Sequence, residues 1–324
     1  MGVLPLLRPA RVSAQVEADP ATSSQRPALR VLLGSGEANA SSNDTFVFNG
    51  RSYRGTFQHL DDGRIVNVVD LESYLYSVVP GEMSPRWPTG ALEAQAICAR
   101  TYVLQRSDPR RAYDLVPSQL DQVYTGMAGE APGAVAAVDA TAGRVLKFGS
   151  GFAQVAYSSC CGGHTEASSD AWGGLPLPYL GGVVCTSCTG SPNYRWSANL
   201  ELDAIAAHFP VPLEPLGELQ DLRVSGYDRS GRARSFELVA ANGSTTVGAT
   251  AFRLTIGARV LRSLLVTSLR RAPDKTAVLV DGGGLGHGVG LCQWGARGMA
   301  QSGADANAIL ALYFPGTVIG DYDR

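Results

Sequence analysis

The segment Tyr76-Ser-Val-Val-Pro-Gly-Glu-Met-Ser-Pro-Arg-Trp87 leads into a long helical pattern, Thr89-Gly-Ala-Leu-Glu-Ala-Gln-Ala-Ile-Cys-Ala-Arg-Thr-Tyr-Val-Leu-Gln105. The adjacent proline and glycine of the first segment predict a turn, and the small and apolar residues that recur on one face of the second predict a closely packed helix. Glu82 lies on this turn, next to Met83. Apolar surroundings disfavour the charged form of a carboxyl group, so the sequence makes Glu82 a candidate general acid.

The composition is that of a folded protein. Of the 324 residues, 45% are hydrophobic and 17% are charged, so the chain can bury a sizeable core. The formal net charge is −2 and the basic residues are spread along the chain, which excludes nucleic acid as the main partner. Runs of roughly 20 apolar residues, the length that crosses a bilayer, are absent from the sequence, so we expect no membrane span.

The N-terminal segment shows no periodicity. Residues 1–27 are expected to form a disordered tail or the remnant of an export signal, because the small residues around Ala14 resemble a cleavage site. This resemblance to a signal favours an extracytoplasmic location, in the cell wall, in the periplasm or as a secreted protein.

Strand and helix patterns alternate along the rest of the chain. The β-type runs at 28–33, 45–57 and 64–69 predict a β-rich N-terminal part with an Asn-Gly hairpin turn at 49–50. A helix is predicted at 134–141.

A second β-rich stretch follows. A strand is predicted at 151–157, and the pattern from about 198 to 270 is again β, with a hairpin around Asn242-Gly243. The sequence therefore predicts an α+β fold, mostly β with a few packed helices, whose two lobes form a cleft. One domain is expected over 28–324, with the β-rich lobe at about 198–270.

Four of the six cysteines fall into two close pairs joined by a short connection. Cys160 and Cys161 form the first pair, and Cys185 and Cys188 the second. In an exported protein the two pairs could be joined by a disulfide. With His164 nearby, the same residues could instead bind zinc in a closed structural site.

A glycine-rich motif lies near the end of the chain, Asp281-Gly-Gly-Gly-Leu-Gly-His-Gly-Val-Gly-Leu-Cys-Gln-Trp-Gly-Ala-Arg-Gly-Met299, and a helix is predicted to follow it. Glycine at this density lets the backbone approach a ligand or another segment closely. A phosphate loop is excluded because no Gly-Lys-Ser/Thr follows, and the spacing does not match a dinucleotide fingerprint. His287 and Gln293 are the polar groups that this loop would present.

Three separate motifs together resemble the SpoIID/LytB family. They are Tyr74-Leu-Tyr-Ser-Val-Val-Pro-Gly-Glu-Met83, Tyr157-Ser-Ser-Cys-Cys-Gly-Gly-His-Thr-Glu166 and Gly286-His-Gly-Val-Gly-Leu-Cys-Gln-Trp-Gly-Ala296. They occur in the order that the family has, and the resemblance covers roughly residues 28–320. Three ordered motifs are far more specific than any one short pattern.

The resemblance implies a cell-wall protein whose sporulation members are lytic transglycosylases. These act on peptidoglycan glycan strands from which the stem peptides have been removed. The family's catalytic glutamate falls on Glu82, no cofactor is needed for catalysis, and some members bind zinc near the segment that here contains the first cysteine pair. The residues expected to bind substrate around the cleft are Gln95, Arg100, Ser158, His287 and Gln293.

The mechanism that the resemblance implies uses one carboxylate. Protonated Glu82 would donate its proton to the glycosidic oxygen between N-acetylmuramic acid and N-acetylglucosamine. The same residue would then take the proton from the C6 hydroxyl of the muramic acid, which closes onto C1 to give the 1,6-anhydro sugar. A second acidic residue is not required, because the substrate supplies the nucleophile.

Two other roles remain open for the residues of this site. Glu82 could be structural, capping the next helix or pairing with Arg86 or Arg100. As the LytB side of the resemblance implies, the chain could also be a non-catalytic peptidoglycan-binding protein that stimulates a cell-wall amidase.

A cysteine hydrolase is the third alternative. Cys161 or Cys292 would be its nucleophile, with His164 or His287 as the base. Paired cysteines in an oxidising compartment are more often bonded than nucleophilic, which disfavours this alternative.

Overall fold

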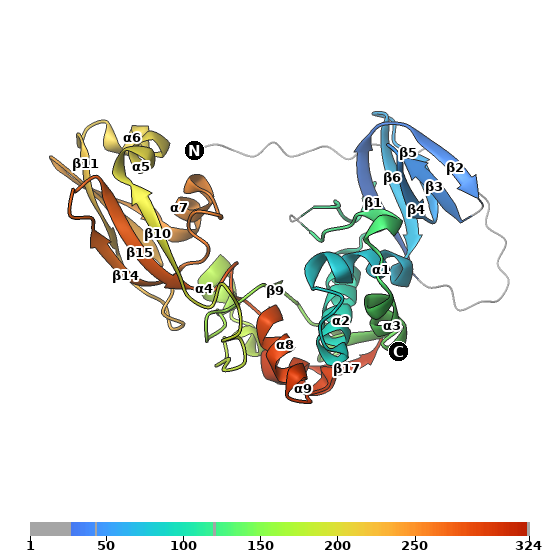
Figure 1. Cartoon of the computed structure of the whole chain (residues 1–324). Coiled ribbons are helices and arrows are strands. Elements are labelled where there is room, and N and C mark those ends of the chain that lie inside the picture. Colours follow the sequence, from blue (N-terminus) through green and yellow to red (C-terminus); the bar gives the residue numbers. More distant parts are fainter. Residues whose placement is uncertain (1–26, 43, 119–120, 323–324) are drawn as a thin grey trace. The chain divides into compact units, whose positions relative to one another are not determined.

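The computed structural model describes residues 27–42, 44–118 and 121–322 (Figure 1). The chain divides into two compact units, which are described separately. Unit 1 is formed by the chain up to Gln154 together with the segment from Val318 onward, and unit 2 spans Val155–Thr317. The expected tail or export signal at 1–27 lies, except for its last residue, outside the described residues.

Unit 1 begins with two small antiparallel sheets. In the sheet β2-β3-β4, the predicted Asn-Gly hairpin is confirmed, and Asn49 and Gly50 have φ values of 47° and 78°. The strand predicted to run on to residue 57 stops at Gly55, whose φ is +81° and where a side chain would collide with the Val68 carbonyl. The chain then changes sheet, and β5 pairs with β6. The strands are β1 (Ala28–Ser35), β2 (Ala38–Ser42), β3 (Thr45–Phe48), β4 (Arg51–Arg54), β5 (Thr56–His59) and β6 (Arg64–Asp70).

Helix α1 (Leu71–Glu82) replaces the turn that the Pro-Gly pair predicted. Its N-cap is Asp70, whose carboxylate accepts hydrogen bonds from the amides of Glu72 and Ser73 at 3.1 and 3.2 Å. Its apolar residues are buried at helical spacing and carry the helix through Pro80. The prediction of a turn was wrong because the packing of this buried face outweighs the local preference of one proline near the helix end.

Unit 1 is completed by two further helices and a third sheet. Helix α2 confirms the helix predicted over 89–105, and α3 confirms the one over 134–141 with an earlier start. In the sheet β17-β7-β8, the C-terminal strand β17 returns to pair with β7. The elements are α2 (Thr89–Arg106), the 3₁₀ turn η1 (Gly126–Gly129), α3 (Pro132–Ala140), β7 (Arg144–Phe148), β8 (Gly151–Phe152) and β17 (Val318–Asp321).

A buried ion pair joins the helices of unit 1. The guanidinium of Arg100 on α2 donates to the carboxylate of Glu72 on α1, with Nη2 to Oε2 at 2.6 Å and Nε to Oε1 at 2.9 Å. Its remaining donors reach the carbonyls of Val138 and Arg144, and the Glu72 carboxylate also accepts from the amide of Gly143. The side chains of Glu72 and Arg100 are 2% and 0% exposed, so the pair joins α1, α2 and the end of α3 in the interior of the unit.

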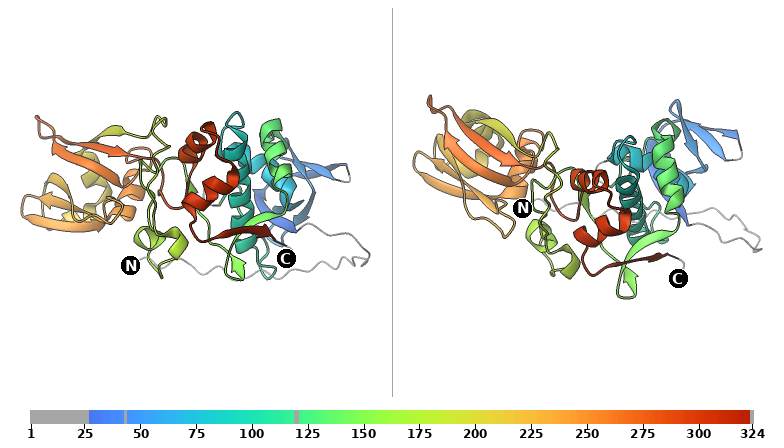
Figure 2. Two further views of the ribbon diagram at one scale, coloured as in Figure 1. Left: turned by 90° about the horizontal axis from the view of Figure 1, so that it is seen from below. Right: turned by 60° about the horizontal axis from the view of Figure 1, so that its bottom comes forward.

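Unit 2 contains a β-rich lobe made of two three-stranded antiparallel sheets, β10-β15-β14 and β11-β12-β13. Figure 2 shows these sheets, coloured yellow to orange, with short helices packed against them. The second predicted Asn-Gly hairpin is confirmed, because β12 and β13 pair from Ala240 and Gly243 outward. The elements are β10 (Trp196–Glu201), α5 (Leu202–His208), α6 (Pro210–Leu213), β11 (Leu219–Val224), β12 (Ser235–Ala240), β13 (Gly243–Gly248), α7 (Ala249–Ile256), β14 (Leu265–Arg271) and β15 (Ala277–Gly283).

An aromatic cluster forms the centre of this lobe. Phe252 of α7 stacks on Phe209 with ring centroids 5.4 Å apart, and it also contacts Phe236 of β12 at 4.5 Å. All three rings are buried among leucine and valine side chains of both sheets.

The remainder of unit 2 is mainly loops held by short elements. The predicted strand over 151–157 was wrong, since it is divided between β8 in unit 1 and β9 in unit 2. Strand β9 pairs in parallel with β16, so that Ser158 lies opposite Cys292. Two helices stand where one was predicted after the glycine-rich motif, because Gly303, with φ +93°, separates them. The elements are β9 (Tyr157–Ser158), α4 (Ser168–Trp172), the 3₁₀ turn η2 (Pro178–Leu180), β16 (Leu291–Cys292), α8 (Gln293–Gln301) and α9 (Ala306–Tyr313).

The described residues form an α+β fold, as predicted. The expected cleft between two lobes stays a prediction. Within the described ranges, none of the helices has both the length and the apolar character that crossing a bilayer demands.

The ion pair of unit 1 leads to a stability prediction. Replacing Glu72 by alanine leaves the fully buried Arg100 guanidinium without its counter-ion, and we expect the free energy of unfolding to fall by about 3–5 kcal/mol. Urea unfolding followed by circular dichroism measures this change. The matched control is Arg110→Ala, which removes a side chain 88% exposed in a surface pair and should leave stability nearly unchanged. Equal effects of the two variants would contradict the structural role of the buried pair.

Candidate functional site

Glu82 is the last residue of α1 and is half-buried. Its Oε1 accepts a hydrogen bond from the backbone amide of Val123 at 3.2 Å. The next residue, Met83, is only 2% exposed, which confirms the apolar neighbour that the sequence predicted. The partial negative charge at the C-terminal end of a helix also lies at this position, and it opposes a second negative charge there.

Two tyrosines lie within the electrostatic reach of Glu82. Burial raises the pKa of Tyr74 well above its usual value, and neighbouring acidic groups, including Glu82, raise it further. Burial likewise raises the pKa of Tyr102 to about 12, and its hydroxyl donates to Asp121 Oδ1 at 3.2 Å. The tyrosines therefore stay protonated hydroxyl groups around Glu82 over the whole physiological pH range.

Gln95 and Arg100 do not face a surface of unit 1. Both side chains belong to α2 and are 0% exposed. The guanidinium of Arg100 donates hydrogen bonds to Glu72 and to backbone carbonyls. Arg100 therefore has a structural role, in place of the predicted contact with substrate or the predicted pairing with Glu82. The sequence argument failed here because it treated polar residues outside the apolar stripe as cleft residues, whereas this helix is buried on more than one face.

Ser158, His287 and Gln293, the other predicted substrate ligands, belong to unit 2. Ser158 and Gln293 are each 6% exposed, and Ser158 Oγ accepts from the amide of Gly288 at 3.2 Å. His287 Nδ1 accepts from the amide of Val289 at 3.0 Å. Burial lowers the pKa of His287 to about 4, so its imidazole is neutral at neutral pH. Ser158, in β9, thus contacts the glycine-rich loop that contains His287.

Four buried cysteines converge in unit 2. The sulfur atoms of Cys161, Cys185, Cys188 and Cys292 all lie within 4.8 Å of one another. Tetrahedral zinc with Zn–S bonds of about 2.3 Å needs sulfur atoms about 3.8 Å apart, and Cys161 and Cys188 have their sulfur atoms 3.7 Å apart. Four thiolates are the usual ligands of a closed structural zinc site, so this cluster fits the metal.

Hydrogen bonds to sulfur support the same cluster. The amides of Cys161 and Gly295 donate to Cys292 Sγ at 3.2 and 3.4 Å, and the Tyr313 hydroxyl lies 3.1 Å from Cys185 Sγ. Backbone amides and a tyrosine hydroxyl are the kind of donors that surround metal-bound thiolates in proteins.

The predicted ligand set needs correction. His164 is not one of the four clustered groups, and its Nδ1 lies 2.7 Å from the carbonyl oxygen of Thr165. Cys160 lies beside the four but is not one of them, and Cys292 takes the place that was assigned to it. All six cysteines lie in the described residues and are free thiols, so the structure does not have the disulfide that was the alternative to zinc. The nucleophiles of the cysteine-hydrolase alternative, Cys161 and Cys292, are both 0% exposed, which argues against that activity.

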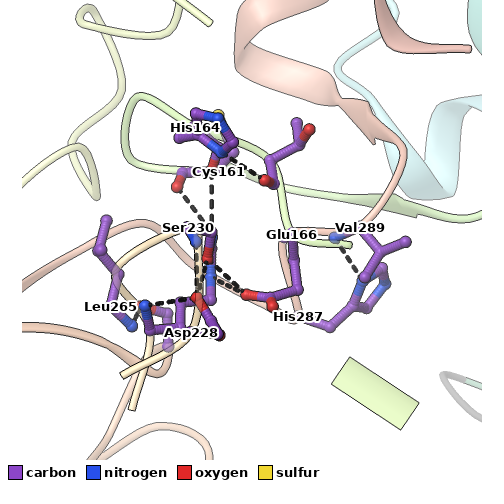
Figure 3. A network of polar contacts seen from close by, with 12 residues as sticks. Cys161, His164, Glu166, Asp228, Ser230, Leu265, His287 and Val289 are labelled. Atoms are coloured by element: carbon purple, nitrogen blue, oxygen red, sulfur yellow. Dashed lines mark hydrogen bonds and ion pairs between the residues drawn. The ribbon is translucent and has the colours of Figure 1, made fainter. Parts of the chain in front are cut away.

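A second polar network was missed by the sequence analysis. Figure 3 shows Glu166 turned toward Ser230 and Asp228. Glu166 Oε2 accepts from Ser230 Oγ at 2.8 Å and lies 3.2 Å from Arg232 Nε, and the Glu166 and Arg232 side chains are each 2% exposed. Arg232 also donates to the carbonyl of Cys161 at 2.7 Å, so the network joins the β-rich lobe to the loop at 160–166, called the cysteine loop.

Burial affects the proton of Glu166. Burial, followed by the hydrogen bond with Asp228, raises the pKa of Glu166 to about 7. Glu166 closes one of the quoted motifs, but no spacing in the sequence connects it with Asp228 or Arg232, which lie more than 60 residues later. The contact depends on the folding of the β-rich lobe.

The chain is similar to several known proteins. A family model described as stage II sporulation protein matches residues 61–148, and a domain of unknown function (DUF8618) matches residues 185–290. An uncharacterized protein of Brachyspira hyodysenteriae is 32% identical over 290 residues, which cover 87% of this chain and 76% of that protein.

Two named relatives come from Bacillus subtilis. The amidase enhancer is 29% identical over 297 residues, 76% of this chain and 40% of the enhancer. Stage II sporulation protein D is 26% identical over 275 residues, 80% of this chain and 76% of that protein.

The raised pKa of Glu166 predicts how stability depends on pH. The folded protein binds this proton up to about pH 7, whereas the unfolded chain releases it near 4.5, so the free energy of unfolding should fall as the pH rises from 4.5 to 7. In Glu166→Gln this component is lost, and the decline over that window should be shallower. Denaturant unfolding of both proteins at a series of pH values tests this, with the exposed Glu218→Gln as control. Parallel profiles for the unaltered protein and Glu166→Gln would refute it.

Proposed function

Because the chain belongs to the SpoIID/LytB family, we propose that it is a lytic transglycosylase that cleaves peptidoglycan glycan strands. Membership of this family gives the chain a role at the cell wall, and an extracytoplasmic location follows from that substrate. The proposed bond is the one between N-acetylmuramic acid and N-acetylglucosamine, in strands without stem peptides.

The position of Glu82 carries the proposal. Its carboxyl group is half-buried at the end of α1, lies beside the buried Met83 and is oriented by the Val123 amide. A carboxyl group that is partly withdrawn from water and fixed by one backbone hydrogen bond suits repeated gain and loss of a proton. Residues 61–148, which the sporulation-protein model matches, include this whole environment.

The reaction needs only this carboxyl group and the substrate. Protonated Glu82 donates to the glycosidic oxygen, the C1–O bond breaks, and N-acetylglucosamine leaves with the proton. The oxocarbenium-like C1 is then attacked by the C6 hydroxyl of the same muramic acid. Glu82, now a carboxylate, takes the hydroxyl proton and is ready for the next cycle. The product is a 1,6-anhydro end, and no water is consumed.

We also propose that Cys161, Cys185, Cys188 and Cys292 bind one structural zinc ion. The four thiolates would fill all four coordination positions of the ion, so the ion would stabilise unit 2 and take no part in the cleavage. It would tie the cysteine loop to β16, two segments that are far apart in the sequence.

A non-catalytic role is the second candidate. The amidase enhancer of Bacillus subtilis, 29% identical to this chain, favours a protein that binds the wall and stimulates a cell-wall amidase. Under this alternative the protein would bind glycan strands and release no product by itself.

Glycan cleavage tests the catalytic proposal. With denuded strands, the unaltered protein should release fragments with 1,6-anhydro ends, and Glu82→Gln, which cannot donate a proton, should lose at least about 100-fold in rate. Mass spectrometry of the products measures both. Glu37→Gln, an exposed glutamate of unit 1, is the matched control and should keep full activity. Ordinary reducing ends would indicate a hydrolase instead. If the unaltered protein releases no product but increases the activity of an added cell-wall amidase, the enhancer role would be favoured.

Metal analysis tests the zinc site. Elemental analysis of the purified protein should find about one zinc per chain, and Cys188→Ser should lower this content and the thermal unfolding midpoint. Cys98→Ser, at a buried thiol of α2 outside the cluster, should keep the metal. Without reductant, unfolding in chelator should expose six thiols to alkylation. Protection of four of them, with no zinc in the unaltered protein, would show disulfides and overturn the proposal.

A further inference from the structure

A pocket of about 310 Å³ lies within unit 2 and uses no residue of unit 1. Helix α4 forms one wall with Asp170 and Trp172, and α7 contributes Arg253 to another. Glu166 and His287 complete the polar lining, while alanine and leucine side chains supply apolar surface. A volume near the lower end of the range for ligand sites suits one small ring better than an extended chain.

Acceptor atoms in the lining lack donors. Among the described residues neither Glu166 Oε1 nor Asp170 Oδ2 accepts a hydrogen bond, although both atoms are buried. The guanidinium of Arg229 lies 3.7 Å from Asp170 Oδ2, which is beyond hydrogen-bond distance. Glu166 is 2% exposed, so bulk solvent does not supply the missing hydrogen bond, and leaving the oxygen unsatisfied costs free energy. Buried acceptors in folded proteins are normally paired, and a ligand with hydroxyl or amine donors would pair both.

An aromatic side chain lies at the same pocket. Trp172 is 57% exposed even though its ring centroid is only 5.1 Å from that of His287. Its large apolar face is therefore fixed on one side by the imidazole and available on the other. Such a face packs well against the C–H surface of a sugar ring, whose hydroxyl groups point sideways toward acceptors.

The charges of the lining favour a neutral ligand. Asp170 is paired with Arg234 and Arg229 at 3.5 and 3.7 Å, and Glu166 with Arg232 at 3.2 Å. Arg253 donates to the carbonyls of Leu261 and Arg262. Each of these carboxylates is already paired with an arginine. The guanidinium groups would therefore repel an ammonium ligand, and the carboxylates would repel a phosphate.

We propose that this pocket binds a single neutral sugar ring, with its hydroxyl groups donating to Glu166 and Asp170 and its apolar face on Trp172. The choice of a wall amino sugar, N-acetylglucosamine, rests on the proposed function. The site would hold the glycan strand on unit 2 and take no part in bond cleavage.

Binding of short N-acetylglucosamine oligomers to the full chain tests the inference. The measurement is made by titration calorimetry in the Glu82→Gln background, so that turnover does not consume the ligand. Trp172→Ala should weaken binding roughly tenfold, because an aromatic contact contributes up to about 1.5 kcal/mol. Trp172→Phe should keep most of the affinity. Asp170→Ala should also weaken binding, whereas Leu175→Ala, at a side chain 89% exposed and outside the lining, should not.

The outcomes separate this inference from the proposed function. Sugar binding that is the same in Trp172→Ala and Asp170→Ala as in their background would overturn the pocket assignment, even if Glu82-dependent cleavage is found. Tighter binding of inorganic phosphate or of a diamine than of the sugar would also overturn it. Conversely, sugar binding that depends on Trp172, together with no cleavage by the unaltered protein, would support the pocket and count against the transglycosylase.

Discussion

The buried pair between Glu72 and Arg100 is the interaction on which unit 1 depends. A guanidinium that is 0% exposed can be accommodated only where every donor finds an oxygen, so α1, α2 and the end of α3 must meet in one arrangement. Glu82 lies at the other end of α1, nearly three helical turns from Glu72. The position of the helix that carries the candidate catalytic carboxyl group therefore depends on a charged contact that does not touch Glu82. The Val123 amide then orients the carboxyl group itself.

Unit 2 also contains a buried arginine that pairs with a carboxylate and donates to backbone carbonyls. Arg232, from the β-rich lobe, pairs with Glu166 and donates to the carbonyl of Cys161, and it is almost as buried as Arg100. Here the partners are loops rather than helices, and loops have few other contacts to hold them. A planar guanidinium with several fixed donors can hold two loop carbonyls and a carboxylate at once, which a lysine could not do.

The sequence predicted the features that local chemistry determines. Both hairpins formed where Asn-Gly predicted them. Asn49 and Gly50 make the first turn with positive φ, whereas in the second hairpin Gly243, with φ +148°, is the first paired residue after the turn. The helix α2 was predicted from its helical pattern. Helix α1 was missed because Pro80 and Gly81 indicate a turn when burial is unknown. Cys292 was not assigned to the metal cluster because no spacing joins it to the Cys-x-x-Cys pair at 185–188. Features made by long-range contact were thus outside the reach of pattern analysis.

The loop between Cys160 and Glu166 shows why these distant contacts matter for function. At one end, Cys161 contributes its sulfur to the four-thiol cluster and its carbonyl to Arg232. At the other end, the amide of Glu166 donates to the carbonyl of Gly288 in the glycine-rich loop, while its carboxyl group lines the pocket. Glycine is required at Gly288, where a Cβ would collide with the Arg232 guanidinium. The loop is therefore fixed by the sulfur cluster through Cys161, by Arg232 and by the backbone at Gly288. The carboxyl group of Glu166 faces the pocket because these three contacts fix the loop that carries it.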